Sequence, residues 1–531
     1  MIMSASYEHF SWNQTGPGVW GRATDEAEVF YSSLAKLYEG SGRMFFAITG
    51  HLSIEFDCSS VPTCNQPEAL VDTALRNAWL TLRHHHPTIA SQVVRDPSTG
   101  NFNKVYRTLR DADEQEAWLV ATCVKVWTDK SGVEWANSDP PSPHVPTLFI
   151  VDPPSPARSA GGRAKIVRRD LVFRSPHDII DGIGTLLFFR NLVKHASEAF
   201  AVGTSFQLPS FKGTEVKNLS PPYRVAAAVS SAATEAREKR LVEMAEQGSQ
   251  GKNGEGSDVK VLTVPFKHGA TLPGMHQRVA VTISKDQSSK LLAACAAKGA
   301  TVTHAFHAAI PVVLRDICQE TEPNGEAKHG RYVNYILRNE RASCVEPYGT
   351  DQHPVAVYHS VSGGSLTVDL DLHKAPENGQ DGGEAAVSIV EEEREFRGVL
   401  NQMKEFYHGI RNDPEHAHLA PHIWASAAPE LPPISTTELP PVPPPKTAPS
   451  VSISSMGRVD SVIPPEAGAL SVHDPWVTGE ELTNGLGLFL GTYRGRVCLS
   501  GAYNDAWHDG EEVVGFLRRC ERAVFRGLGI E

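Results

Sequence analysis

The chain has 531 residues, more than the roughly 250–300 at which a single hydrophobic core stops growing, so we expect two lobes. Hydrophobic residues make up 40% of it and charged residues 21%, which excludes a disordered or fibrous protein. A formal net charge of -12 at pH 7 argues against nucleic acid as a partner, because a general nucleic-acid binder needs a basic face.

The cysteines and the apolar runs indicate the compartment. The eight cysteines are scattered and form no Cys-x-x-Cys pair, which favours a reducing environment. Residues 1–12 lack a basic start followed by an apolar core. No apolar run approaches the roughly 18 residues that a membrane span requires. We therefore expect a cytoplasmic, monomeric protein without a membrane span.

The first half of the chain predicts alternating helices and strands. Apolar residues recur at near-helical spacing over 67–85, and Pro87 ends that helix. Apolar and polar residues alternate over 44–56, as they do in a half-buried strand. The elements expected before residue 245 are helices over 25–37, 67–85, 114–126 and 183–201, and strands over 44–56, 148–151 and 164–173.

The Gly- and Ser-rich run over 246–258 has the composition of a flexible linker, so we place the lobe boundary there. Residues 1–245 are then the N-terminal lobe and residues 259–531 the C-terminal lobe. Loops are expected over 379–383 and over the proline-rich segment 429–450. The elements expected in the second half are strands over 259–266, 277–283, 331–337 and 496–503, and helices over 285–298, 303–318 and 510–526.

A histidine lies at the connection between a predicted strand and a predicted apolar helix. Pro176 lacks an N–H and disfavours helix in the residue before it, so the chain must turn at His177. His177 is then either a general base or a buried histidine bonded to a backbone carbonyl. Asp181 precedes the helix by one or two residues, where a carboxylate can cap it; the alternative is a catalytic partner of the imidazole.

The segment Ser-Pro-His-Asp-Ile-Ile-Asp-Gly, residues 175–182, resembles the His-x-x-x-Asp-Gly acyltransferases. That superfamily includes chloramphenicol acetyltransferase, the BAHD acyltransferases and nonribosomal peptide condensation domains, and the similarity spans roughly residues 43–526. Segments 302–307 and 454–457 look most like fungal O-acetyltransferases of the trichothecene 15-O-acetyltransferase type. The BAHD signature Asp-Phe-Gly-Trp-Gly is absent, and Pro176 replaces the first of two histidines common in condensation domains.

The resemblance implies an α/β fold, an α+β sandwich, with two chloramphenicol-acetyltransferase-like lobes and a tunnel between them. It implies direct transfer of an acyl group from acyl-CoA, in particular acetyl-CoA, to a hydroxyl of a small apolar secondary metabolite. His177 would be the general base, without a covalent enzyme intermediate, a bound cofactor or a metal. Asp181 and Gly182 would form the structural motif. The arginine partner of Asp181 would be Arg338 or Arg341, with Arg338 the better candidate.

Two alternatives stay open. A condensation-like enzyme would use the thioester of a carrier protein acting in trans, or would catalyse cyclisation. A second alternative is a non-catalytic binding module.

Other residues are weaker candidates for the site. The substrate pocket could include five residues that core packing also explains: His304, His307, Tyr503, Asn504 and Trp507. Clustered cations are informative in an acidic chain, so the CoA phosphates could contact Lys267, Arg494 and Arg496. The histidines of 84–86 are interpreted as partners of the dipole at a helix C-terminus. Those of 416–422 are interpreted as a solvated loop, not a metal site.

Overall fold

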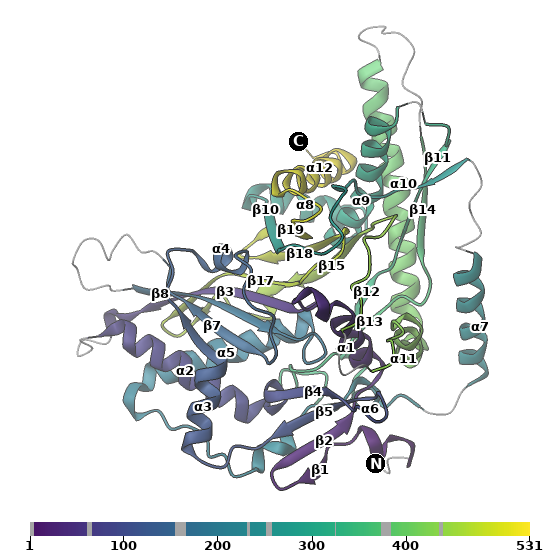
Figure 1. Cartoon of the computed structure of the whole chain (residues 1–531). Helices are drawn as coiled ribbons and strands as arrows, with labels where there is room; N and C mark the ends of the chain where they lie inside the picture. The colour runs from purple at the N-terminus through teal and green to yellow at the C-terminus, as the bar shows by residue number, and fades with distance from the viewer. Residues whose placement is uncertain are drawn as a thin grey trace.

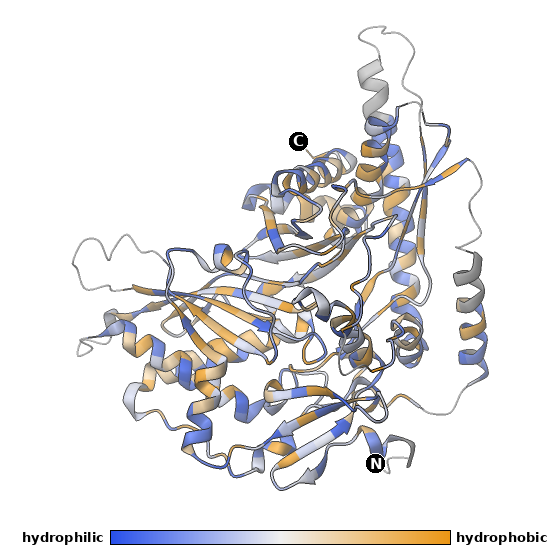
Figure 2. Ribbon diagram, in the orientation of Figure 1, coloured by the Kyte–Doolittle hydropathy of each residue, from blue (hydrophilic) through white to orange (hydrophobic). Residues whose placement is uncertain are grey.

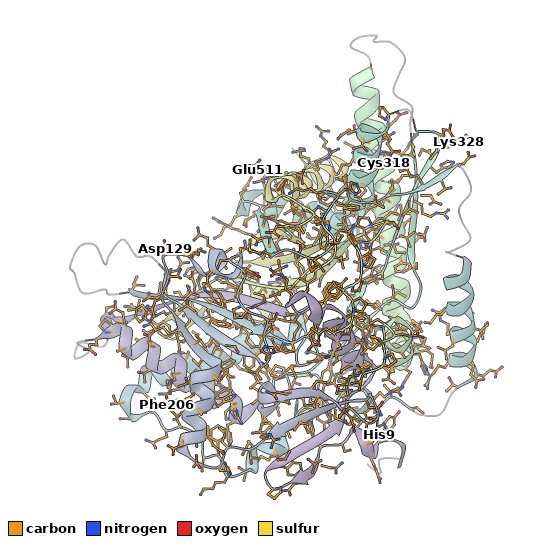
Figure 3. All side chains as sticks on the ribbon, viewed as in Figure 1. His9, Asp129, Phe206, Cys318, Lys328 and Glu511 are labelled. Carbon is orange, nitrogen blue, oxygen red and sulfur yellow. The ribbon has the colours of Figure 1, made fainter. Side chains whose placement is uncertain are left out.

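Two hydrophobic cores divide the molecule into two lobes (Figure 1). Apolar residues gather inside each lobe (Figure 2), and side chains fill the space between helices and sheets (Figure 3). The computed structural model describes residues 5–60, 66–153, 166–230, 234–250, 258–323, 325–372, 384–434 and 439–530.

The elements of the first half are β1 (Asn13–Gly16), β2 (Val19–Ala23), α1 (Glu26–Tyr38), β3 (Ile48–Asp57), α2 (Pro67–His85), β4 (Ser91–Arg95), β5 (Phe102–Arg107), α3 (Ala112–Thr122), β6 (Cys123–Val126), α4 (Gly132–Ala136), β7 (Thr147–Val151), β8 (Ile166–Ser175), α5 (Gly182–Val202), α6 (Tyr223–Ala226) and α7 (Glu235–Gln250).

The elements of the second half are β9 (Val259–Val261), β10 (His276–Thr282), α8 (Lys285–Ala297), α9 (Val302–Thr321), β11 (His329–Asn334), β12 (Leu337–Asn339), β13 (His359–Val361), β14 (Leu366–Asp371), α10 (Glu384–Asn412), α11 (His416–Ala427), β15 (Val451–Arg458), β16 (Glu466–Ala467), β17 (Leu470–Gly479), β18 (Leu486–Tyr493), β19 (Arg496–Asn504) and α12 (Gly510–Leu528).

The N-terminal lobe is built on a six-stranded sheet in the order β16-β17-β3-β8-β7-β6. Helices α2 and α5 pack against each other and against this sheet, because each presents an apolar stripe to it. Strand β8 pairs along its whole length with β3, and its residues from Asp170 to Ser175 are all buried. The segment that leads into His177 is therefore a central strand of the lobe.

Strand β17 belongs to this sheet although it lies in the second half of the sequence (Figure 1). Its residues Leu470, Val472 and Val477 are each 1% exposed or less and lie in the N-terminal core. Without β17, the edge of β3 would present unpaired backbone groups. The expected division at residue 245 is therefore incomplete, because the chain crosses back into the first lobe.

The C-terminal lobe is built on a four-stranded sheet in the order β10-β19-β18-β15. Helices α8, α9, α10 and α12 contribute to its core. A smaller three-stranded sheet, in the order β14-β11-β9, packs against α9 and α10. The two halves thus repeat a mixture of helix and strand, as the sequence predicts.

Most of the predicted elements are confirmed, and the exceptions have structural reasons. The helix expected over 114–126 ends at Thr122, because the next four residues form β6 and pair in parallel with β7. The histidines of 416–422 lie on α11 and not in a solvated loop. Residues 246–250 of the expected linker are helical in α7. The expected loop over 379–383 and residues 251–257 lie outside the described residues.

Three further findings concern the described ranges only. None of their helices is long and apolar enough to cross a membrane. Their cysteines are all free thiols. They hold no cluster of three or more side chains arranged to bind a metal ion.

Candidate active site

His177 lies on the short connection between β8 and α5. The connection turns at Pro176, whose carbonyl accepts a hydrogen bond from the Ile179 N–H at 3.3 Å. Ile179 and Ile180 are 1% and 0% exposed, so the turn is anchored in the core. The His177 side chain is half-buried. The strand-to-turn-to-helix arrangement predicted for the motif is therefore present.

Asp181 is the N-cap of α5 and is bound from three directions. One carboxylate oxygen accepts a hydrogen bond from the Gly184 N–H at 2.6 Å. The other accepts from Arg341 Nη1 at 2.9 Å and from the Tyr358 N–H at 2.7 Å. Burial alone would raise the pKa of this carboxyl, but the Arg341 guanidinium and the nearby His359 hold it well below its usual range. Asp181 is thus an ionised structural anchor.

The preference for Arg338 as the partner of Asp181 was wrong. Arg338 lies within β12, and its guanidinium is 3.4 Å from Glu340 Oε1 and donates to the Ile410 carbonyl at 3.3 Å. Arg341 follows the end of β12, where a 3₁₀ turn directs the side chain toward α5. Both members of the Asp181–Arg341 pair have side chains that are 4% exposed, so each compensates a charge that is otherwise buried.

Two aromatic side chains surround the His177 imidazole, and no sequence pattern pointed to either. The ring of Tyr31, on α1, is stacked on it with centroids 3.7 Å apart and planes 4° apart. The ring of His359, on β13, lies 5.6 Å away. The Tyr31 hydroxyl and His359 Nε2 share a hydrogen bond of 2.8 Å. No local pattern links α1 to residue 177, so only the folded chain reveals this contact.

The surroundings of His177 favour its neutral form. Burial, and after it the nearby His359, lowers the pKa of the imidazole to about 3. Among the residues that the structure describes, Nδ1 of His177 is buried and has no hydrogen-bond partner. An imidazole with a depressed pKa carries a free lone pair at neutral pH, so it is able to accept a proton.

Helix α1 is held against the motif by buried polar contacts. The Ser32 hydroxyl donates to Asp178 Oδ2 at 2.7 Å, and Lys104 Nζ donates to the Asp178 carbonyl at 2.6 Å. Lys104 also forms a buried ion pair with Glu28, which Arg22 contacts at 2.7 Å. Burial raises the pKa of the Asp178 carboxyl to about 6. Residues 31 and 32 of α1 therefore contact residues 177 and 178 of the motif.

The five side chains considered for the substrate pocket pack within the C-terminal lobe. His307 is fully buried between the hydroxyls of Tyr407, at 3.0 Å, and Tyr332, at 3.1 Å. His304 Nδ1 accepts the Thr301 N–H at the start of α9. The Asn504 amide donates to the Gly274 carbonyl and accepts its N–H, and Tyr503 and Trp507 are 5% and 2% exposed. No contact described for these five residues reaches His177, and their place in a substrate pocket stays a prediction.

The three cations considered for CoA lie in two places. Lys267 pairs with Asp509 at 2.5 Å and lines a surface pocket of about 380 Å³ together with His268 and Lys446. Arg494 and Arg496 flank the turn between β18 and β19, where Arg494 pairs with Glu466 at 2.8 Å. Lys446, which the sequence analysis missed, is exposed. The structure therefore groups Lys267 with Lys446 and separates both from Arg494 and Arg496.

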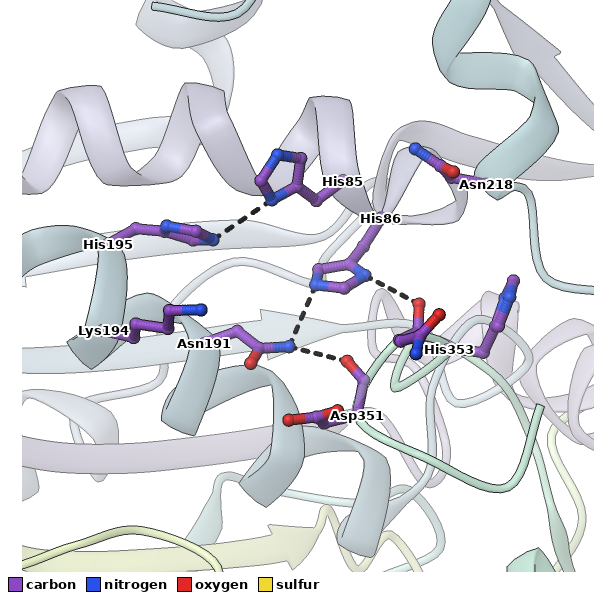
Figure 4. A pocket seen from close by; sticks show the side chains of 9 residues that line it. His85, His86, Asn191, Lys194, His195, Asn218, Asp351 and His353 are labelled. Atoms are coloured by element: carbon purple, nitrogen blue, oxygen red, sulfur yellow. Dashed lines mark hydrogen bonds between the residues drawn. The ribbon is translucent and has the colours of Figure 1, made fainter. Parts of the chain in front are cut away.

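The helix-end histidines tie α2 to α5 beside a second pocket, of about 330 Å³ (Figure 4). His85 Nδ1 is 3.2 Å from His195 Nε2, and His86 Nε2 is 3.0 Å from Asn191 Nδ2. Asn191 also donates to the Asp351 carbonyl at 2.8 Å. The interpretation of these histidines as partners of a helix dipole therefore misses their contacts with the neighbouring helix.

Gly184 is required by the packing of the motif. A Cβ at this position would lie 2.3 Å from the Pro354 carbonyl oxygen and 2.7 Å from Arg341 Nη2. We expect Gly184→Ala to lower the free energy of unfolding by about 1–3 kcal/mol, because the clash displaces the Arg341 guanidinium. The matched control is Gly515→Ala in α12, where a Cβ meets no described atom within 4 Å and we expect a gain of about 0.5–1 kcal/mol. Urea unfolding measures the free energy of unfolding of both variants. Equal changes in the two would contradict the predicted clash at Gly184.

Comparisons with known proteins support the motif-based resemblance. The sequence profile of the family described as 15-O-acetyltransferase Tri3 matches residues 52–333. The O-acetyltransferase pigM of Monascus ruber is 24% identical over 523 residues, which cover 98% of this chain and 88% of that protein. The acetyltransferase pigO of Monascus ruber is 23% identical over 527 residues, which cover 98% of both.

Solved structures share the fold. The TRI3 trichothecene 15-O-acetyltransferase from Fusarium sporotrichioides superimposes with a TM-score of 0.74 at 18% identity, over 98% of both chains. The first condensation domain of the CDA synthetase superimposes with a TM-score of 0.56 at 12% identity, over 96% of both chains. The expected fold of two chloramphenicol-acetyltransferase-like lobes is therefore confirmed.

Proposed function

Because the chain belongs to the family described as 15-O-acetyltransferase Tri3 and is an acyltransferase, we propose that it acetylates a hydroxyl of a small apolar secondary metabolite, with acetyl-CoA as the donor and His177 as the general base. The observation that carries this proposal is the environment of His177. Its imidazole is held neutral on a turn that the ionised Asp181–Arg341 pair anchors.

The proposed reaction needs one proton acceptor and no covalent enzyme intermediate. Nδ1 of His177 is buried, so Nε2 takes the proton of the acceptor hydroxyl as its oxygen attacks the thioester carbonyl. The tetrahedral intermediate then collapses, the C–S bond breaks, and the CoA thiolate leaves. The imidazolium returns its proton to this thiolate, since the thiolate of a thiol with a pKa of about 8.5 is a stronger base than the imidazole. The ester and free CoA are the products.

The pocket that contains Lys267, His268 and Lys446 supports CoA as the donor. CoA carries three phosphate groups, and ammonium groups bind phosphates by charge-assisted hydrogen bonds. In a chain with a formal net charge of -12, one pocket of about 380 Å³ is lined by two lysines, of which Lys267 is paired with Asp509. We assign this pocket to the phosphates of the donor in preference to the turn with Arg494 and Arg496.

Reversing the charge of Lys446 tests this assignment. We expect Lys446→Glu to raise the KM for acetyl-CoA about tenfold and to leave kcat unchanged, because the lost contact is the same in the ground state and the transition state. The control is Arg496→Glu, a charge reversal of another exposed residue, for which we expect a KM within twofold of the wild type. Steady-state kinetics with varied acetyl-CoA measure both. Similar KM values for the two variants would contradict the assignment of this pocket to the phosphates of the donor.

The activity itself is tested by incubating the protein with acetyl-CoA and a panel of small apolar alcohols, while free thiol is measured. Thiol release that depends on an alcohol supports the proposal, and mass spectrometry of the ester identifies the acceptor. Release only from an acetylated carrier protein would instead favour a condensation-like enzyme, whose fold this chain shares. No release from either donor by the folded protein would favour a binding module.

A further inference from the structure

We infer that Tyr31 and His359 are positioning residues for the base: the Tyr31 ring is the surface on which the His177 imidazolium forms, and His359 holds that ring in place. The inference rests on the proposed role of His177. It goes beyond that role because it assigns a task to two side chains outside the His-x-x-x-Asp-Gly motif.

Helix α1 makes a paired contact with the motif. Tyr31 is stacked on His177, and the next residue, Ser32, donates to the carboxylate of Asp178 at 2.7 Å. Two consecutive residues of one helix thus hold two consecutive residues of the motif. Tyr31, Ser32 and Asp178 are 7%, 5% and 7% exposed. Contacts in so enclosed a place leave the imidazole little freedom to rotate.

Helix α1 is itself a rigid support. Asp25 and Glu28 form a capping box at its start, and Glu28 pairs with Arg22 and Lys104. Lys104 comes from β5 and also donates to the Asp178 carbonyl at 2.6 Å. The buried ion pairs therefore connect the start of α1 directly to the motif. A shift of α1 would leave these charges without compensation.

Tyr31 and His359 are joined by a hydrogen bond. His359 Nδ1 is 3.7 Å from Asp181 Oδ2. A proton on Nδ1 is favoured by this negative charge, so Nε2 of the neutral ring carries the lone pair. The Tyr31 hydroxyl then donates to Nε2 at 2.8 Å. The Asp181 charge thus acts on His359 across 3.7 Å without a hydrogen bond, and the Tyr31–His359 hydrogen bond holds the ring that is stacked on His177.

The chemistry explains why a parallel aromatic ring is useful there. The imidazole becomes a cation only while it holds the acceptor's proton. The face of an aromatic ring carries the negative part of its quadrupole and attracts a cation. A ring with its centroid 3.7 Å away and parallel to within 4° therefore stabilises the imidazolium more than the neutral imidazole. Interactions that strengthen in the transition state raise kcat and not only affinity.

The charged groups around the imidazole contribute little to stabilising the imidazolium. The cation is disfavoured by burial and by His359 when that residue is charged, and it is favoured by Asp181. Asp181 is already bound to Arg341, which reduces the field that it exerts. Asp178 is bound to Ser32 on α1. Among the described residues, Tyr31 provides the ring that is stacked on the imidazole.

The experiment compares Tyr31→Leu, Tyr31→Phe and His359→Ala in the full chain, with acetyl-CoA and an accepted alcohol. We expect Tyr31→Leu to lower kcat about tenfold with both KM values within twofold, because only the transition state loses stabilisation. Tyr31→Phe keeps the ring and should recover most of that loss, with a fall of about threefold. The control is Phe30→Leu, which removes a ring of α1 that lies edge-on to Tyr31 at 5.1 Å and has no described ring contact with His177, and we expect its kcat to be within twofold of the wild type.

Double variants separate positioning from a merely structural role. Tyr31→Phe and His359→Ala break the same hydrogen bond, so the double variant should be no slower than the slower single one. In a His177→Ala background, Tyr31→Leu should cause no further loss of the residual rate, because the imidazolium is absent. The inference is overturned if Tyr31→Leu keeps kcat within twofold, or if Phe30→Leu or the His177→Ala background shows the same loss. A full rate in His177→Ala alone would contradict the proposed function instead.

Discussion

Replacing His177 with alanine should lower turnover about 10²–10⁴-fold while the protein stays folded, because general-base help of this kind typically contributes that much. The side chain lies on a turn, and the contacts described for it are ring contacts with Tyr31 and His359. Its buried Nδ1 has no hydrogen-bond partner among the described residues, so the substitution leaves no partner unpaired. The remaining rate reports the positioning of the two substrates.

The measurement is kcat with saturating acetyl-CoA and alcohol, together with the thermal midpoint of unfolding. The control is His329→Ala, which removes an exposed imidazole that pairs with Asp371 at the edge of the C-terminal lobe. We expect no change in its rate. Near-normal turnover in His177→Ala would exclude His177 as the base, and a variant that does not fold would show that the side chain is structural.

Replacing Arg341 with alanine should cost about 3–5 kcal/mol of stability, because it leaves the buried Asp181 carboxylate without its cation. Activity should fall together with stability, since Asp181 anchors the turn that carries His177. The folded-state pKa of Asp181 lies below its unfolded value of about 3.9, so the pair contributes stability above that pH and loses it as the pH falls. The difference between the variant and the wild type should therefore shrink in acid.

Denaturant unfolding at pH 7 and at about pH 3, below the unfolded pKa of the carboxyl, measures this difference. The control is Arg331→Ala, whose side chain is 30% exposed and pairs with Asp369, 47% exposed, so we expect a loss of about 1 kcal/mol or less. Equal losses for the two arginines would contradict the assignment of Arg341. Asp181→Asn should also lose stability and activity together. A fully stable and inactive Asp181→Asn variant would indicate a direct catalytic pair with His177 instead.

The sequence alone predicted the elements that position the base. The apolar periodicity of α2 and α5 and the run that forms β8 are local patterns, and they match the observed bounds within about two residues. Pro176 required a turn at His177, and the likeness of the motif to known acyltransferases pointed to the chemistry. Asp181 was expected as a helix cap, and its side chain accepts the Gly184 N–H of α5. These features depend on neighbours a few residues away.

The tertiary structure alone decided which distant residues meet. Arg338 and Arg341 are three residues apart in one segment, and their choice depends on where β12 ends and the chain turns back toward α5. Tyr31 reaches His177 only because buried ion pairs hold α1 against the motif. Strand β17 joins the first lobe because β3 needs a second partner along its edge. The physical reason is the same in each case: periodicity reports which face of an element is buried, whereas the identity of the facing residue is set by how the elements cross in space.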